Sequence, residues 1–238
     1  WSGRPCDMDS LLDIGKEFNI PIVEDACHAL QAEYKGKRCG SFGITGCFSF
    51  HPLKNLNVWG DGGIITTNDQ FLADRLKLIR NHGLVGRNTC VEFSYNSRLD
   101  TIQAVVAKHL IENNLENITA KRRSNALFLD SELSNFAEVA TTSRHEYLKE
   151  VFHLYMFTTS HRDNLVEHLQ SFGIDAKIHY PIPMHLQPAA KSFGYKSGDF
   201  PVAEHLASQC ISLPVHEFIT PDHLQFMIDK VRSYFKGK

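Results

Sequence analysis

The sequence predicts an α/β protein in which one sheet-based layer is followed by a smaller α+β region. Up to about residue 100, short apolar segments typical of strands alternate with segments that carry apolar residues at helical spacing. After about residue 135 the order changes to strands that are followed by helices. We therefore expect two domains, which comprise residues 1–115 and residues 116–238.

The first region contains two expected helices and three expected strands. Residues 7–18 place apolar side chains at helical spacing and acids near the start, which predicts a helix. The charged amphipathic pattern of residues 69–81 predicts a second helix. Short apolar or β-branched runs predict strands over residues 20–24, 46–50 and 62–67.

The second region begins with a long helical segment and then mixes strands with helices. Asp100 is the expected N-cap of one helix, and a second helix is expected over 115–133 with Lys121, Arg122 and Arg123 on its exposed side. The remaining pattern predicts strands over 152–159 and 174–180, a helix over 162–172 that ends at Gly173, and a helix over 221–235 capped by Thr220.

The composition excludes several classes of function. The net charge is −2 and no basic block occurs, so we expect no nucleic-acid partner. No apolar run has the length of a membrane span and no signal-peptide pattern opens the chain, so we expect a cytoplasmic protein without a membrane partner. The six cysteines lack CxxC spacing and the 13 histidines are dispersed, so we expect free thiols and no metal site.

Lys54 is the most informative residue. It follows the aromatic-rich segment 46–50 and precedes a run with three glycines, Gly60-Asp61-Gly62-Gly63. Most lysines are solvated surface residues, but this is an unusual position for an unused charge. A lysine that is removed from water has a lowered pKa and becomes a nucleophile that forms imines.

Two further residues, together with Lys54, form a set of groups that could bind a cofactor. Asp25 ends the apolar segment 20–24, where it is either a helix N-cap or a carboxylate for a protonated ring nitrogen. Adjacent Glu24 would point to the other side of the strand. Ser49, five residues before Lys54, is either a small core residue or a phosphate ligand. A lysine, a strand-end acid and a serine are the groups that hold pyridoxal 5′-phosphate (PLP), the lysine through a Schiff base.

Together the motifs resemble the DegT/DnrJ/EryC1/StrS family of PLP-dependent nucleotide-sugar aminotransferases, which have fold type I. The matching segments occur in family order over nearly the whole chain: Glu24–His28, Gly40–Gly43, Cys47–Leu56, Gly60–Gly63, Asn81–Gly83, Tyr95–Asp100, His179–Ala189, Gly198–Glu204 and Leu213–Pro214. The resemblance implies the later part of a fold type I large domain, with a mixed and mostly parallel sheet, followed by a small α+β C-terminal domain.

The resemblance also implies roles for individual residues. Lys54 would be the Schiff-base lysine and proton carrier, and Asp25 would pair with the pyridine nitrogen. Among the remaining cofactor residues, His28 would lie beside the ring hydroxyl, Ser49 would bind the phosphate, and Asn96 would reach the phosphate across a homodimer interface. The implied substrate-binding residues are Arg98, His179, Tyr180 and His185. Two of these assignments have alternatives: His28 could be a packed core histidine, and the His179-Tyr180-Pro181 segment could be purely structural.

The expected reaction transfers an amino group from glutamate, or a similar amino-acid donor, to a keto nucleotide-deoxysugar. Relatives have an additional N-terminal segment that carries part of the cofactor site, and Trp1-Ser2-Gly3 is not an initiator sequence, so we expect that an N-terminal portion is missing. Three alternatives stay open: a PLP-dependent sugar 3-dehydratase, which Lys54 disfavours because such relatives carry histidine there, a truncated, non-catalytic module that binds a sugar nucleotide or a partner, and an α/β domain with Lys54 on its surface.

Overall fold

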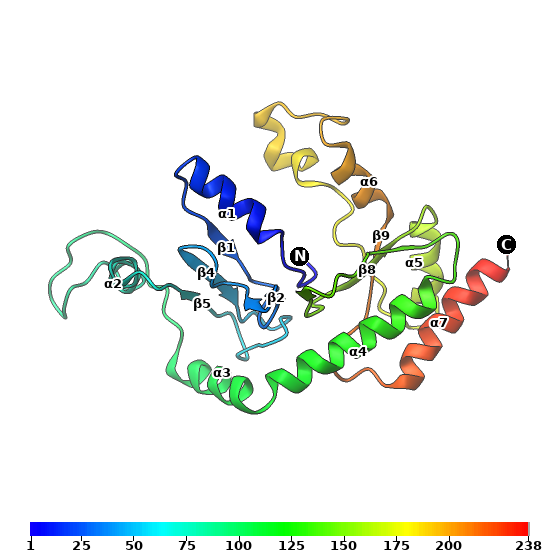
Figure 1. Cartoon of the computed structure of the whole chain (residues 1–238), viewed down its shortest axis with the longest axis horizontal. Coiled ribbons are helices and arrows are strands. Elements are labelled where there is room, and N and C mark those ends of the chain that lie inside the picture. The colour runs from blue at the N-terminus through cyan, green and yellow to red at the C-terminus, as the bar shows by residue number, and fades with distance from the viewer. Residues whose placement is uncertain (238) are drawn as a thin grey trace. The chain divides into compact units, whose positions relative to one another are not determined.

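The computed structural model describes residues 1–237, which form two compact units (Figure 1). The first unit contains Trp1, Gly3–Ala120 and His145–His153. The second contains Ser2, Lys121–Arg144 and the residues from Leu154 onward. The boundary between Ala120 and Lys121 falls inside helix α4 (Leu115–Leu133). The two-domain division expected from the sequence stays a prediction.

The central sheet of the first unit has the strand order β1-β4-β5. β1 (Val23–Asp25) runs parallel to β4 (Thr45–Ser49), and β5 (Gly63–Thr66) pairs antiparallel with β4. Asp25 lies opposite Cys47, two residues before Ser49. Because parallel strands end at the same edge of a sheet, Asp25 and Ser49 come together at one edge, which is where ligands bind in open α/β sheets.

A second, small sheet brings a distant segment into the first unit. Its strands are β2 (Glu33–Tyr34), β3 (Lys37–Arg38) and β7 (Leu148–Lys149), in the order β3-β2-β7. These two-residue strands are not predicted from the sequence, because such short pairings leave no periodic pattern. β7 lies within the segment 145–153, so its pairing with β2 holds that segment in the first unit.

The helices of the first unit begin at side-chain caps. Asp7 accepts from Ser10 N at the start of α1 (Met8–Glu17), and Asp69 accepts from Leu72 N at 3.0 Å in α2 (Gln70–Ile79). Asp100 and Gln103 form a capping box at α3 (Thr101–Asn113), which confirms Asp100 as the N-cap.

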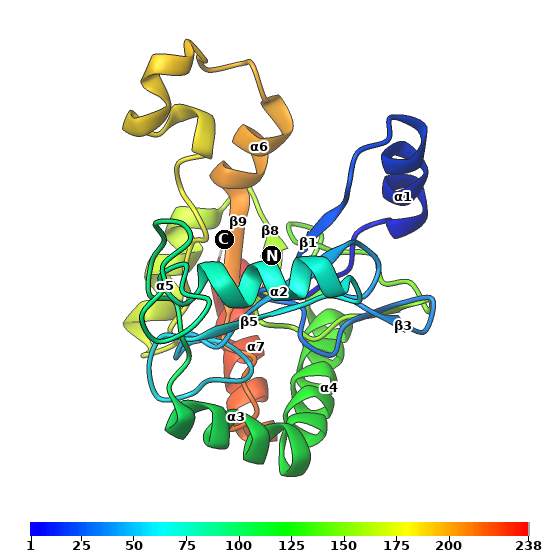
Figure 2. The same ribbon diagram turned by 90° about the vertical axis from the view of Figure 1, so that its left-hand side faces the viewer.

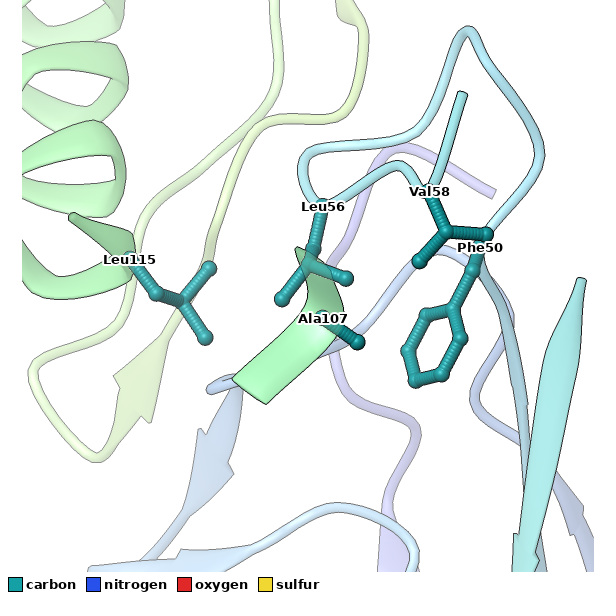
Figure 3. Packing of buried hydrophobic residues seen from close by; sticks show 5 residues of the cluster. All are labelled: Phe50, Leu56, Val58, Ala107 and Leu115. Atoms are coloured by element: carbon teal, nitrogen blue, oxygen red, sulfur yellow. The ribbon is translucent and has the colours of Figure 1, made fainter. Parts of the chain in front are cut away.

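One apolar cluster packs against the loop between β4 and β5 (residues 50–62), which carries Lys54 and is called the lysine loop below. Figure 3 shows Phe50, Leu56 and Val58 pointing toward Ala107 of α3, with Leu115 on the other side of Leu56. All five side chains are at most 5% exposed. The residues on both sides of Lys54 are therefore anchored in a close-packed core.

The second unit packs helices on a three-stranded antiparallel sheet. Its strands are β6 (Ala140–Thr141), β8 (Tyr155–Thr158) and β9 (Cys210–Leu213), in the order β6-β8-β9. α5 (Arg162–Ser171) packs against β9 and α7 (Pro221–Lys236). The 3-10 helices η1 (Met184–Leu186) and η2 (Pro188–Phe193) precede α6 (Pro201–Gln209), which leads directly into β9 (Figure 2).

Most expected elements are confirmed, and two details are wrong. Residues 174–180 form no strand, since only Lys177 makes a bridge, to Ser212, and the apolar alternation is satisfied by burial of Ile174 and Ala176. Arg122 does not lie on an exposed face of α4: it is 8% exposed and pairs with Glu217 at 3.1 Å. The ion pair compensates for the burial of the guanidinium group. No pattern in the sequence predicts Glu217 as its partner.

Candidate active site

Lys54 lies at the wall of a cavity at the carboxyl end of β4. The cavity is lined by Cys27, His28, Leu30, Ser49, Lys54, Asn55, Leu56 and His153. Lys54 N hydrogen-bonds to His51 O at 2.8 Å, which closes a turn after β4 and sets the position of the lysine. The structure thus brings Lys54, His28 and Ser49 together, as the sequence predicts.

The Lys54 amine is partly removed from water. Burial lowers the pKa of Lys54 below its ordinary value of 10.5, while the negative charge of Asp25 acts in the opposite direction. A lowered pKa increases the neutral, nucleophilic fraction of the amine at neutral pH. This environment suits the nucleophilic role expected for Lys54, which stays a prediction.

Asp25 is kept ionised by its neighbour in sequence. The thiol and the main-chain N–H of Cys27 hold the pKa of the Asp25 carboxyl below 3.8, with Cys27 N donating to Asp25 Oδ1 at 3.1 Å. The carboxylate is exposed, whereas Glu24 is buried on the other face of β1. An ionised, accessible carboxylate beside a lysine is the group that a protonated ring nitrogen requires.

His28 lines the same cavity. Its Nδ1 hydrogen-bonds to the main-chain carbonyl oxygen of Trp1, so this nitrogen carries the proton. Burial, followed by the positive charge of Lys54, lowers the pKa of His28 below 6.5. At neutral pH the ring is therefore uncharged, and its Nε2 is the nitrogen left for a ligand.

Ser49 ends β4 and lines the cavity with its hydroxyl. Ser49 Oγ accepts a hydrogen bond from His51 N at 3.2 Å, which fixes the oxygen near the start of the lysine loop. Its proton stays available for an anionic oxygen. The side chain is only partly buried, as a phosphate ligand at a sheet edge would be.

Glu24 secures the strand that carries Asp25. Its carboxylate accepts hydrogen bonds from Gly40 N at 2.6 Å, Phe42 N at 2.5 Å and Gly43 N at 2.7 Å. Gly40 has φ of +82°, and a Cβ there would lie 2.2 Å from the Phe48 ring. Only glycine fits this turn, so the motif Gly40–Gly43 is explained by a structural role.

Asn96 and Arg98 lie in the exposed loop between α2 and α3. Asn96 pairs with Asn81 in an isolated bridge, and Arg98 Nη1 donates to Asn81 Oδ1 at 2.7 Å. Both side chains are open to solvent and neither lines the lysine cavity. Their expected roles, a phosphate contact across an interface and a substrate contact, stay predictions.

His179, Tyr180 and His185 belong to the second unit. His179 Nδ1 lies 2.9 Å from Ser212 Oγ, and burial lowers the pKa of His179 below 6.5. His185 Nε2 lies 3.0 Å from Glu204 Oε1, and only 8% of the His185 side chain is exposed. Tyr180 is 58% exposed. The expected substrate contacts of these three residues stay predictions. The pairing with Glu204 also gives His185 a structural role.

Besides the apolar Leu30 and Leu56, three cavity residues are not predicted as site residues by the sequence. Cys27 and Asn55 lie inside the quoted motifs, whereas His153 lies in the expected strand 152–159. Asn55 Nδ2 donates to Val151 O at 2.9 Å, and its buried Oδ1 has no hydrogen-bond partner within the described residues. A buried acceptor without a partner is costly, so a water or a ligand donor is expected there.

The donor groups at this sheet edge fit PLP. The cavity offers an amine with a lowered pKa, a hydroxyl and an imidazole. The ionised carboxylate of Asp25 does not line the cavity itself but ends β1 at the same sheet edge. Among residues 1–237, no group of three or more His, Cys, Asp or Glu residues could hold a metal ion. No helix in that part of the chain is long and apolar enough to cross a membrane.

Comparison with known proteins places these residues in a family. The model of the DegT/DnrJ/EryC1/StrS aminotransferase family matches residues 1–232. The chain is 36% identical over 232 residues to a dTDP-3-amino-3,4,6-trideoxy-alpha-D-glucose transaminase of Streptomyces venezuelae, covering 98% of this chain and 61% of that protein. It is 33% identical over 223 residues to a UDP-2-acetamido-2-deoxy-3-oxo-D-glucuronate aminotransferase of Pseudomonas aeruginosa, covering 91% of this chain and 59% of that protein.

A solved structure confirms the expected fold class. The crystal structure of S. venezuelae DesV in complex with a ketimine intermediate superposes with a TM-score of 0.94 at 36% identity, covering 98% of this chain and 62% of that chain. This chain therefore spans less than two thirds of the length of these relatives.

Proposed function

Because the chain belongs to the DegT/DnrJ/EryC1/StrS aminotransferase family, we propose that the protein is a PLP-dependent nucleotide-sugar aminotransferase. It would transfer an amino group from glutamate, or a similar donor, to a keto group of a nucleotide-linked deoxysugar. The observation that carries this proposal is the Lys54 amine with its lowered pKa in a cavity shared with His28 and Ser49.

Each residue has a task in this proposal. When bound, PLP supplies an electron sink that accepts an amino group and later releases it. Lys54 holds the cofactor covalently and carries a proton to and from the substrate carbon. Asp25 keeps the pyridine nitrogen protonated, His28 faces the ring hydroxyl, and Ser49 binds the phosphate.

The names of two relatives support the substrate class. One is a dTDP-sugar transaminase and the other a UDP-sugar aminotransferase, so the nucleotide differs between relatives. Arg98, His179, Tyr180 and His185 are the residues that we assign to the nucleotide sugar and the donor carboxylate. We assign Asn96 to the cofactor phosphate of a second copy, which makes a homodimer part of the proposal.

The amino-donor half of the reaction tests the function without knowledge of the sugar. The protein is loaded with PLP and mixed with L-glutamate, and the 2-oxoglutarate released is quantified. We expect about one equivalent per protein chain, and none from Lys54→Arg, which keeps the charge but cannot exchange the cofactor. PLP binding without release of a keto acid would instead favour a non-catalytic binding module. Because the relatives are longer, the same assay on the longest product of the gene is the control.

A further inference from the structure

His153 lies in the lysine cavity although it is remote from Lys54 in sequence. It lines the cavity together with His28, Ser49 and Lys54. Its ring centroid lies 4.2 Å from that of His28, and the two ring planes are inclined by 34°. This spacing is that of aromatic rings in direct contact.

The backbone before His153 is fixed by hydrogen bonds on both sides of one peptide. Val151 N donates to Gly3 O at 3.0 Å, and Val151 O accepts from Asn55 Nδ2 at 2.9 Å. Val151 is fully buried and Asn55 is 7% exposed. Asn55 follows Lys54 directly, so the lysine loop itself holds the segment that carries His153.

Phe152 turns the chain toward the cavity. It has φ of +47°, in the left-handed region, although it is a bulky residue and 3% exposed. Such a conformation persists only where the surrounding structure enforces it, and it occurs disproportionately at functional sites. The segment is therefore built to place the next side chain, that of His153.

The orientation of His28 depends on what covers its ring. Its Nδ1 is held by the carbonyl oxygen of Trp1, and the Trp1 ring contacts the imidazole with centroids 6.1 Å apart. The ring of His153 packs closer, with centroids 4.2 Å apart, and further restricts rotation of the imidazole. The direction of Nε2 is then defined before any ligand arrives.

We propose that His153 is a positioning residue of the cofactor site: its ring backs that of His28 and fixes the direction in which His28 faces the hydroxyl of the cofactor ring. This inference rests on the proposed PLP-dependent function. It adds the segment 145–153 to the site, although that segment carries none of the residues assigned above.

Three substitutions of His153 distinguish an effect of its aromatic ring on His28 from an effect of its volume alone. His153→Phe keeps a flat ring, His153→Leu fills a similar volume without one, and His153→Ala removes the side chain. His145→Ala is the matched control, because His145 stacks on Tyr147 in the same segment with ring centroids 5.2 Å apart and does not line the cavity.

The experiment measures the Kd for PLP by absorbance titration and the visible circular dichroism of the bound cofactor, which reports how its ring is held. We expect His153→Leu and His153→Ala to raise the Kd about 2- to 12-fold and to change the dichroic band, since an aromatic pair contributes that much. We expect His153→Phe and His145→Ala to match the wild type. In a His28→Ala background, substitution of His153 is expected to have no further effect.

The outcomes distinguish this inference from the proposed function. If the wild type binds PLP on Lys54 but His153→Leu leaves both readouts unchanged, or its effect persists in His28→Ala, the positioning role is overturned and the function stands. If the wild type forms no adduct with PLP on Lys54, the proposed function fails and this inference fails with it.

Discussion

Glu24 and Asp25 are adjacent acids with opposite tasks. Glu24 is 8% exposed and accepts three main-chain N–H groups, whereas Asp25 is exposed at the sheet edge. Strand alternation alone predicts that the two side chains diverge. It does not predict that the inner acid organises the turn 40–43, because that requires the three-dimensional path of the loop.

Substitution Glu24→Gln should destabilise the first unit. The amide keeps one acceptor but loses the charge that strengthens three hydrogen bonds, and its NH2 group faces main-chain donors. We expect a loss of about 3 kcal/mol in the free energy of unfolding, measured by urea denaturation. Exposed Glu17→Gln is the control and should change stability by less than about 0.5 kcal/mol. Equal stability of the two variants would contradict the role given to Glu24.

Lys54 should react as a neutral amine at a lower pH than exposed lysines do. Burial lowers its pKa, and the charge of Asp25 opposes that shift, so Asp25→Asn should lower the pKa further. The check is the pH dependence of modification by trinitrobenzenesulfonate, quantified at each lysine by mass spectrometry, with Lys108 of α3 as an exposed reference. A midpoint for Lys54 at or above that of Lys108 would show that the cavity does not desolvate the amine.

At the scale of elements, Tyr155 joins strand β8 to helix α4. Its hydroxyl donates to Asp130 Oδ1 at 2.9 Å, and Asp130 also binds Arg144 Nε at 2.8 Å. Burial, followed by the charge of Asp130, raises the pKa of Tyr155, so the phenol remains a donor at all ordinary pH values. The buried hydroxyl and the ion pair therefore hold the two elements together.

Substitution Tyr155→Phe should cost about 1.5 to 3 kcal/mol of unfolding free energy, the contribution of a hydrogen bond to a charged group. The ring is fully buried and stays in place, so packing is unchanged. Tyr195→Phe, at a half-exposed tyrosine of the same unit, provides the comparison and should be close to neutral. Stability loss in both variants alike would point to a general effect of removing hydroxyl groups.

The elements that the sequence predicts are those with a strong periodic or capping signal. Helix α4 has the predicted bounds, and Asp100 and Thr220 are N-caps as expected, Thr220 accepting from His223 N at 3.2 Å. β9 is fully buried and short, so it shows no alternation, and the false strand 174–180 shows alternation without a partner strand. Strand pairing is a long-range property, and local pattern alone cannot decide it.

In the candidate site, too, the residues with a local sequence signal were predicted and those without one were not. Lys54, Asp25, Ser49 and His28 were identified because they lie close together in sequence at the ends of two strands. His153 was not, because its contact with His28 depends on a segment that returns to the first unit through β7 and a left-handed residue, Phe152. Neither feature has a local sequence signal.

At the scale of the whole molecule, buried histidines should make stability depend on pH. Burial lowers the pKa values of His28, His179 and His216 below 6.5. The unfolded chain then binds protons more readily than the folded one, so the free energy of unfolding falls as the pH falls through about 6.5. The carboxyls with lowered pKa values, such as Asp25 and Glu204, titrate only below this window.

Urea unfolding measured between about pH 5 and pH 7.5 checks this expectation. We expect stability to decrease toward acid in the wild type and to depend less on pH when the three histidines are replaced by glutamine. A triple variant with the same slope as the wild type would assign the pH dependence to other groups.

The central claim is that Lys54 anchors a PLP cofactor at the sheet edge formed by β1 and β4. The most direct measurement is to add PLP to the protein, treat it with borohydride, and map the modified residue by peptide mass spectrometry. We predict a yellow protein with the reduced pyridoxyl group on Lys54 alone, and loss of this adduct in Lys54→Arg with other lysines unmodified. Modification spread over exposed lysines such as Lys108, with none at Lys54 in the longest product of the gene, would contradict the account.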